Sequence, residues 1–100
     1  MEGTTKSGFH FHIDPQKLNN WKTIKRLGAL TKAEETEQLN AIFDLSEILL
    51  GEEQEAALTA HVEKLEGAEE GMASFSGVTK ELMEIITLAQ NDGALKKSSS

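Results

Sequence analysis

Two histidines near the start of the chain have a spacing that metal sites use. His10 and His12 lie between Phe9 and Ile13, in a stretch where apolar and polar residues alternate. This alternation predicts a strand, in which both imidazoles project to one side and could bind a metal ion if a third ligand converged. The remaining histidine, His61, falls on an apolar helical stripe, as a boundary residue does. We therefore predict no metal site, and keep a histidine metal-binding module as an alternative that a zinc titration would test.

Acidic runs at Glu52, Glu53 and Glu55 and at Glu69 and Glu70 look at first like catalytic carboxylate pairs. A general acid and its base need partly buried environments that separate their pKa values. These runs fall at a helix start and in a linker, where water covers them. The chain also has no cysteine, no nucleophile-elbow serine, no glycine-rich phosphate loop and no calcium-loop spacing. We predict no catalytic residues, no cofactor and no small-molecule substrate.

The hydrophobic periodicity predicts a mainly α fold, with a small four-helix domain preceded by a short N-terminal β-strand or extended arm. Residues 1–8 are small and polar and are expected to be disordered, and so is a C-terminal tail over residues 92–100. A single helical domain is expected over residues 9–91, because one hundred residues is an ordinary size for one domain.

The four helices are expected at residues 15–28, 31–50, 52–66 and 74–91. Their boundaries are marked by Asp14-Pro15, a capping box of Thr31 and Glu34, Gly51, Gly67 and Ser74. Side chains of Asp, Ser and Thr accept the free amide hydrogens of a helix start, and glycine ends helices because it adopts the left-handed conformation. The strand from Phe9 to Ile13 must pair, lie against these helices or stay extended, because one strand is not stable alone.

Several apolar residues fall off the stripes that should form the core. The core stripes are expected to be Leu39, Ile42, Phe43, Ser46, Leu49 and Leu50 on the second helix, and Phe75, Val78, Leu82, Ile85, Ile86 and Ala89 on the fourth. The residues off these stripes, our candidates for partner contact, are Leu45, Ile48, Met83 and Leu88. The alternative is that these four are ordinary core or surface residues. Trp21 lies on the first stripe and is expected to be a core or interface anchor.

Charge is distributed unevenly along the chain. Residues 1–32 carry six Lys/Arg against two Asp/Glu, residues 33–95 carry two against fifteen, and the whole chain has a formal net charge of −7. Opposite fields of this kind favour head-to-tail self-association. The residues expected to carry that contact are Lys22, Lys25, Arg26, Glu52, Glu53 and Glu55. The acidity argues against nucleic-acid binding, and no apolar run approaches the roughly 20 residues that cross a membrane.

The order of these features resembles a known family. The resemblance covers residues 9–90 and rests on the Phe/His strand, Asp14-Pro15, Leu18, Trp21, a lysine-rich turn into Leu27, an acidic helix ending in the run from Ile42 to Gly51, and then Leu58, His61, Val62 and Leu65. In this pattern the chain resembles the small tail assembly chaperones of long-tailed (siphovirus) phages and prophages of Gram-positive bacteria.

The resemblance implies a mostly helical, non-enzymatic protein in the cytoplasm of the bacterial host. Family members bind the tape measure protein, keep it soluble, help recruit the tail-tube protein and are absent from the mature virion. A longer form made by ribosomal frameshift is common, and Lys96-Lys97 is compatible with one, as it is with a solubilising tail. The alternative function is a small acidic regulatory binder of a basic protein, of the antitoxin or nucleic-acid-mimic type.

Overall fold

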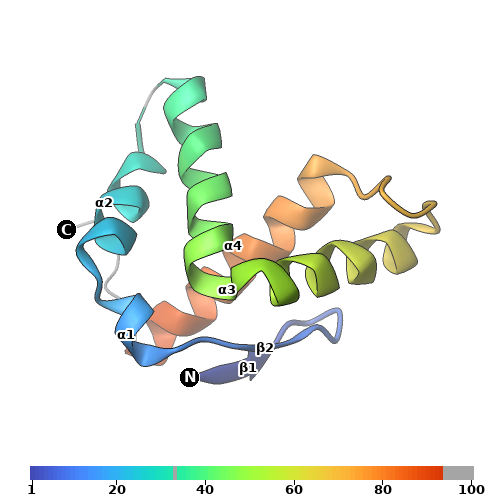
Figure 1. Cartoon of the computed structure of the whole chain (residues 1–100), viewed down its shortest axis with the longest axis horizontal. Helices are drawn as coiled ribbons and strands as arrows, with labels where there is room; N and C mark the ends of the chain where they lie inside the picture. The colour runs from blue at the N-terminus through green and yellow to red at the C-terminus, as the bar shows by residue number, and fades with distance from the viewer. Residues whose placement is uncertain (33, 94–100) are drawn as a thin grey trace.

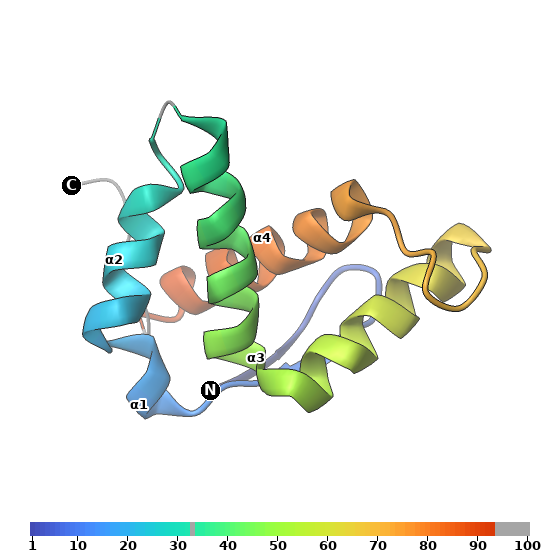
Figure 2. The ribbon, with the colours of Figure 1, turned by 45° about the horizontal axis from the view of Figure 1, so that its top comes forward.

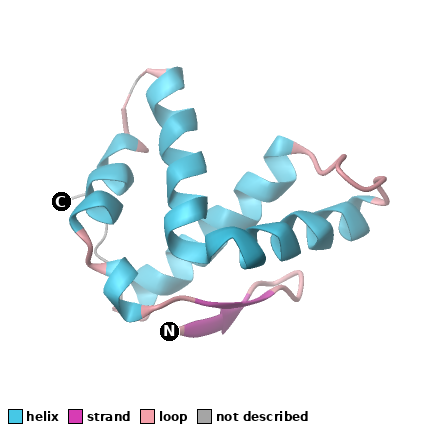
Figure 3. Ribbon diagram, viewed as in Figure 1, coloured by secondary structure: helices cyan, strands magenta, loops and turns pink. Residues whose placement is uncertain are grey.

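The structure is a computed structural model that describes residues 1–32 and 34–93, and within them the fold is mainly helical. In chain order the elements are β1 (Glu2–Thr4), β2 (His10–His12), α1 (Pro15–Leu18), α2 (Trp21–Ala29), α3 (Glu35–Glu66) and α4 (Phe75–Asn91). Figures 1 and 3 show a short hairpin lying beneath a set of helices. The predicted fold class, a four-helix domain preceded by a short strand, is confirmed.

The N-terminal residues differ from the prediction, because residues 1–8 form a strand and a turn. Strand β1 pairs antiparallel with β2, with Gly3 opposite Phe11. A Cβ added at Gly3 would lie 2.7 Å from the Phe11 ring, so any larger residue here would force the buried ring to shift. The hairpin is also held from far along the chain, since the Thr5 hydroxyl donates to Glu81 at 2.8 Å. The local composition of residues 1–8 contains no sign of this long-range contact.

The Phe/His strand is confirmed at β2, and it has one buried and one exposed face. Phe9, Phe11 and Ile13 are buried, whereas His10 and His12 are exposed. The strand lies against α3, where the amide group of Gln54 accepts from the His12 amide at 2.7 Å and donates to the His12 carbonyl. A side chain therefore satisfies backbone groups of β2 that a further strand would otherwise pair with.

The predicted first helix, residues 15–28, is split into α1 and α2. Asn20 is extended and caps α2 by accepting from the Lys22 amide at 2.8 Å. Asparagine favours such caps over helix interiors because its side chain competes for backbone hydrogen bonds. The break turns Trp21 outward, so that its side chain is 82 % exposed and is no part of the core.

The second and third predicted helices are joined in α3 across a sharp kink at Gly51. This residue has φ 76° and ψ 170°, a non-helical conformation open almost only to glycine. The prediction of a capping box at Thr31 and Glu34 is wrong. The Thr31 hydroxyl donates to the Gly28 carbonyl at the end of α2, and Glu34 precedes α3 without a side-chain cap.

The remaining boundaries follow the prediction closely. Gly67 ends α3 in the left-handed conformation, and the Ser74 hydroxyl accepts from the Gly77 amide to cap α4. Asp92 caps the end of α4, and Gly93 has φ 78°. The remainder of the predicted tail, residues 94–100, lies outside the described residues, and so does the Lys96-Lys97 pair.

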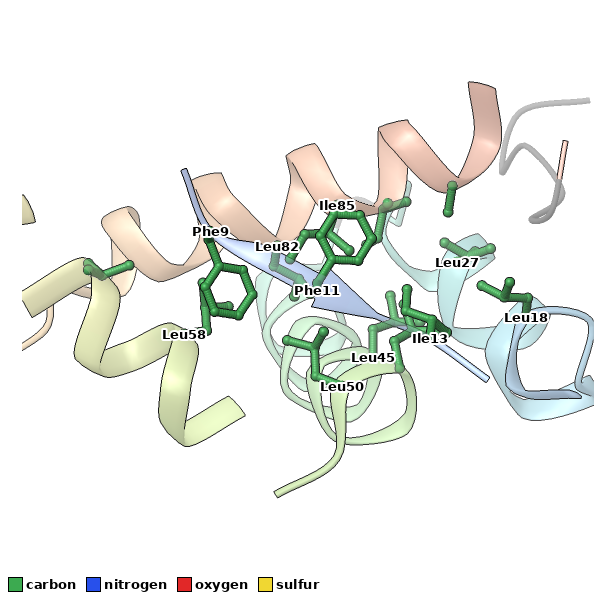
Figure 4. Packing of buried hydrophobic residues seen from close by; sticks show 14 residues of the cluster. Phe9, Phe11, Ile13, Leu18, Leu27, Leu45, Leu50, Leu58, Leu82 and Ile85 are labelled. Atoms are coloured by element: carbon green, nitrogen blue, oxygen red, sulfur yellow. The ribbon is translucent and has the colours of Figure 1, made fainter. Parts of the chain in front are cut away.

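The core lies where the hairpin, the kinked α3 and α4 meet (Figure 4). Phe11 and Ile85 meet there from β2 and α4, and Leu58 joins them from the second half of α3. Leu27 extends the core toward α2. The hairpin therefore covers one side of the helices. It does not cover the opposite side, where the kink of α3 lies open.

Candidate protein-binding groove

The kink at Gly51 creates an open groove. The two halves of α3 diverge at the kink, and α4 crosses behind them (Figures 1 and 2). The groove between these three segments has a volume of about 530 Å³. Its lining residues are Ile42, Phe43, Ser46, Glu47, Glu55, Thr59, Glu63, Gly71, Ala73, Ser74, Phe75, Val78, Thr79 and Leu82. A hollow of this size admits a few large side chains of a partner, but not a whole helix of about 10 Å diameter.

Two phenylalanines form an aromatic pair at the groove. Phe43, from the first half of α3, is 55 % exposed, and Phe75, at the start of α4, is 47 % exposed. Their ring centroids lie 6.0 Å apart at an interplanar angle of 72°, the edge-to-face arrangement that aromatic pairs favour. Large aromatic side chains left half in water are typical of anchor points for a partner.

Carboxylates lie beside this apolar surface. Glu55 accepts from the Ser46 hydroxyl at 2.6 Å and so links the two halves of α3 across the kink. Glu63 accepts from the Gly71 amide at 2.8 Å, and Glu47 is exposed. No lysine or arginine is among the lining residues. The groove therefore combines an apolar surface with negative charge, a combination that favours an apolar partner carrying Lys or Arg.

A hydrogen-bonded turn positions Phe75 at the groove. Glu66, at the end of α3, accepts from both the backbone amide and the hydroxyl of Ser74. These two hydrogen bonds, the side-chain one first, lower the pKa of Glu66 from its ordinary value, because they favour the ionised carboxylate. Since Ser74 directly precedes Phe75, these hydrogen bonds fix the backbone position from which the Phe75 side chain extends.

The predicted partner-contact residues are not the ones that form the groove. Leu45 is fully buried in the core cluster, so its prediction as a contact residue is wrong. Leu88 is half-buried and packs against the core. Ile48 is half-buried beside Trp21, and Met83 is 38 % exposed on α4. None of the four lines the groove.

The groove phenylalanines were missed because both were assigned to core stripes. A signal was nevertheless present, since the turns of α3 before Gly51 are apolar around most of their circumference. Such a helix either is central or has a second contact. The pattern alone does not tell which side of the helix the rest of the chain covers. Leu45 is predicted to contact a partner and Phe43 to lie in the core, whereas Leu45 is buried and Phe43 is exposed.

The predicted self-association residues divide into free and engaged ones. Lys22 and Lys25 are exposed, as are Glu52 and Glu53. Arg26 is engaged within the chain, because its Nε lies 2.8 Å from a carboxylate oxygen of Asp44. Glu55 is engaged at the groove with Ser46, as described above. Arg26 and Glu55 therefore already have side-chain partners within the chain, whereas the other four residues are exposed.

The side chains of His10 and His61 make contacts within the chain. Within the described residues no group of three or more metal-ligating side chains converges on one point. The His10 ring nitrogen Nδ1 lies 3.1 Å from the Thr4 hydroxyl. His61 packs on the Phe9 ring at a centroid distance of 5.5 Å. The imidazoles at 10 and 12 thus share a face, as the strand pattern predicts, without a third ligand beside them.

A serine, a histidine and a glutamate meet where the hairpin joins the helices. Ser7 donates to Glu81 at 2.7 Å, and its oxygen lies 2.9 Å from Nε2 of His61. In a nucleophile triad the imidazole stands between hydroxyl and carboxylate. Here the Ser7 hydroxyl lies between the other two groups and donates its hydrogen bond to the Glu81 carboxylate. The cluster anchors the hairpin to α3 and α4, and it is not arranged to activate the serine.

The fold and the groove define a small, mainly helical protein with an open groove that is partly apolar and lined by carboxylates. Comparisons of the chain with protein-family models, with curated proteins and with solved structures find no match. Across residues 1–32 and 34–93, no helix combines the length and the apolar character that a membrane span requires.

Proposed function

We propose that this chain is a non-enzymatic phage tail assembly chaperone that binds apolar helical segments of a tape measure protein and keeps them soluble. The observation that carries the proposal is the open groove beside Phe43 and Phe75, which the described chain leaves uncovered. The resemblance of the sequence to tail assembly chaperones supplies the class of client. Recruitment of the tail-tube protein, action in the cytoplasm of the bacterial host and absence from the mature virion are proposed on the same resemblance.

The groove suits an amphipathic helix that places a few apolar side chains into it. Helices bind grooves of this kind through residues spaced at i, i+3, i+4 and i+7, which share one face. Phe43 and Phe75 offer that face an aromatic surface. Glu47 and Glu63 favour a client with Lys or Arg beside its apolar stripe, because opposite charges select orientation and register. Binding of this kind is stoichiometric and involves no turnover.

Co-expression tests the proposal. The full chain is expressed with an apolar helical segment of the tape measure protein encoded in the same tail-gene cluster. We expect the segment to stay in the soluble fraction and to co-purify with the chain, and the double variant Phe43→Ala/Phe75→Ala to lose both effects. Leu39→Ala is the matched control, because Leu39 is also exposed on α3 but does not line the groove. A segment that aggregates equally with and without the chain would refute the proposal.

The alternative function is that of a small acidic regulatory binder, and the carboxylates of the groove favour it. It predicts one basic globular protein bound one to one. Charge reversal at Glu47 and Glu63 would then abolish binding, while the two phenylalanine substitutions would leave it intact. If the partner is a client helix, the two phenylalanine substitutions should instead weaken binding more than the charge reversal does.

A further inference from the structure

The sides of the groove differ in polarity. The first half of α3 and α4 supply its large apolar side chains, with Phe43 and Phe75 among them. The second half of α3, which runs from the kink to the connection with α4 (Figure 1), lines the groove with Glu55, Thr59 and Glu63 alone. A polar, acidic wall therefore stands beside an apolar one.

The carboxylates of the groove occupy two separate positions. Since a helix rises by about 1.5 Å per residue, Glu55 and Glu63 lie about 12 Å apart along the axis of α3. Glu55 is at the kink end, where it accepts from Ser46, and Glu47 directly follows Ser46 in the chain. Glu63 is at the far end, where it accepts from the Gly71 amide. Negative charge thus marks both ends of the acidic wall.

Both positions have capacity for a cation. Glu55 and Glu63 each accept through Oε2, and in the described part of the chain their Oε1 atoms make no hydrogen bond and neither residue forms an ion pair. Lys64 and Lys80 are exposed on α3 and α4, but they do not line the groove. The charge of the acidic wall is therefore not paired within residues 1–32 and 34–93, and a cation of a partner is complementary to it.

We infer that the groove selects client helices by the spacing of their cations, and that it takes a helix with two Lys or Arg residues seven positions apart and apolar residues between them on the same face. This inference rests on the proposed function and specifies the client. Residues i and i+7 share one face of a helix and lie about 10.5 Å apart along its axis, which is close to the separation of the two acidic positions.

The same spacing directs the apolar residues of the client. Residues i+3 and i+4 fall between the two cations on that face, and so they reach the apolar wall with Phe43 and Phe75 when the client lies along the second half of α3. Lys and Arg pack their stems on apolar surface and extend their charged ends beyond it. A client helix with Asp or Glu at i or i+7 meets like charge and is rejected.

Three capped helical peptides test the spacing by calorimetry on the full chain. The matched peptide has Lys at i and i+7 and Leu at i+3 and i+4. The shifted peptide has the same composition, with its second Lys at i+9 on the opposite face, and the third peptide has Gln in place of both Lys residues. We expect the matched peptide to bind about fivefold tighter than the shifted one, as the gain of one ion pair allows. The Gln peptide should bind most weakly.

Variant E63Q tests the acidic position at the far end. Glutamine keeps an oxygen that accepts from the Gly71 amide, so the substitution removes charge and preserves the turn. We expect E63Q to abolish the difference between the matched and the shifted peptide. The matched control is E53Q, because Glu53 is exposed on the same half of α3 but does not line the groove. A loss of the difference in E53Q as well would assign it to net charge and would overturn the inference.

The remaining outcomes separate this inference from the proposed function. Equal binding of all three peptides would overturn the spacing, and the proposed function would survive if Phe43→Ala/Phe75→Ala abolished that binding. Binding that follows peptide charge and ignores the two phenylalanines would indicate a basic protein surface as the partner and would overturn the inference. So would a dimer, seen by sedimentation, that binds no peptide and that Phe43→Ala/Phe75→Ala dissociates, because a second copy then fills the groove. The co-expression experiment decides the proposed function in each case, since it uses the natural segment whatever its spacing.

Discussion

The hairpin side and the groove side of the helices treat aromatic residues in opposite ways. On the hairpin side, Phe9 and Phe11 are buried under a strand that the first residues of the chain provide. On the groove side, Phe43 and Phe75 pack edge to face on each other and remain about half exposed. The chain has a cover for one side and none for the other among the residues described. Burial on the first side therefore stabilises the fold, and exposure on the second is what a partner can use.

The same contrast holds for polar groups. On the hairpin side Glu81 is buried and accepts from the hydroxyls of Thr5 and Ser7. In the described chain no buried side-chain nitrogen or oxygen lacks a hydrogen-bond partner. On the groove side Glu47 is exposed and stands beside apolar surface. Glu81 thus attaches the hairpin to α4, whereas Glu47 presents its charge to water.

The largest expected effect is the difference between Phe11→Ala and Phe43→Ala. Phe11→Ala should cost about 3–5 kcal/mol of unfolding free energy, because it leaves a cavity under the hairpin. Phe43→Ala should cost about 1 kcal/mol at most, since it removes a half-exposed ring and one aromatic contact. Urea denaturation followed by circular dichroism measures both. Equal losses would mean that the two sides do not differ in their contribution to stability.

Gly51→Ala tests whether the kink holds the groove open. The non-helical conformation at Gly51 is strained for any residue with a Cβ, so the substitution should cost about 1–3 kcal/mol. If α3 instead straightens to relieve this strain, its two halves no longer enclose the groove and the groove is lost. We then expect binding of a lysine-flanked amphipathic peptide, measured by calorimetry, to weaken. Unchanged stability and unchanged peptide affinity together would refute the role of the kink.

Two helical glycines allow a matched comparison of close packing. A Cβ at Gly77 would lie 2.8 Å from Cγ1 of the buried Val62, whereas a Cβ at Gly28 would meet nothing within 4 Å. Alanine gains about 1 kcal/mol over glycine within a helix, but overpacking costs about 1–3 kcal/mol. Gly28→Ala should therefore raise the thermal midpoint, and Gly77→Ala should lower it. A rise in both would show that the start of α4 can move away from α3.

The smallest effect concerns the turn that precedes Phe75. Ser74→Ala removes the cap of α4, which should cost about 1 kcal/mol at neutral pH. It also removes the main cause of the lowered pKa of Glu66, so that pKa should rise in an NMR titration. Because the pKa is lowered in the folded chain, the stabilisation from Glu66 is present at neutral pH and is lost as pH falls through that pKa. The gap between wild type and variant should accordingly narrow in acid, and a constant gap would assign the whole effect to the cap.

Local sequence signals predicted the elements whose causes are local. The cap at Ser74, the glycine end at Gly67 and the alternation around Phe11 each act within a few residues, and the structure agrees with them. The break at Asn20 is also local in cause, but the apolar stripe of the first helix hid it. Periodicity continues through a short interruption, so it is a poor guide to where one helix becomes two.

The groove could be foreseen only in part. An excess of apolar positions before Gly51 indicates either a central helix or a helix with a second contact. Which residues it uses depends on the direction in which the chain turns at Gly51 and on where α4 returns. Leu45 and Phe43 are only two positions apart, yet one is fully buried and the other largely exposed.

The sequence by itself determined a mainly helical fold, a basic beginning and an acidic body, and the absence of a recognisable reactive motif, because composition and short-range spacing are properties of the chain alone. Only the tertiary structure decided that Glu2–Thr4 pairs with β2, that Trp21 faces water and that Phe43 meets Phe75 at a groove. The attachment of the hairpin to Glu81 and the contact of Phe43 with Phe75 each bring together residues far apart in the chain. Burial is a property of that assembly and not of any single segment.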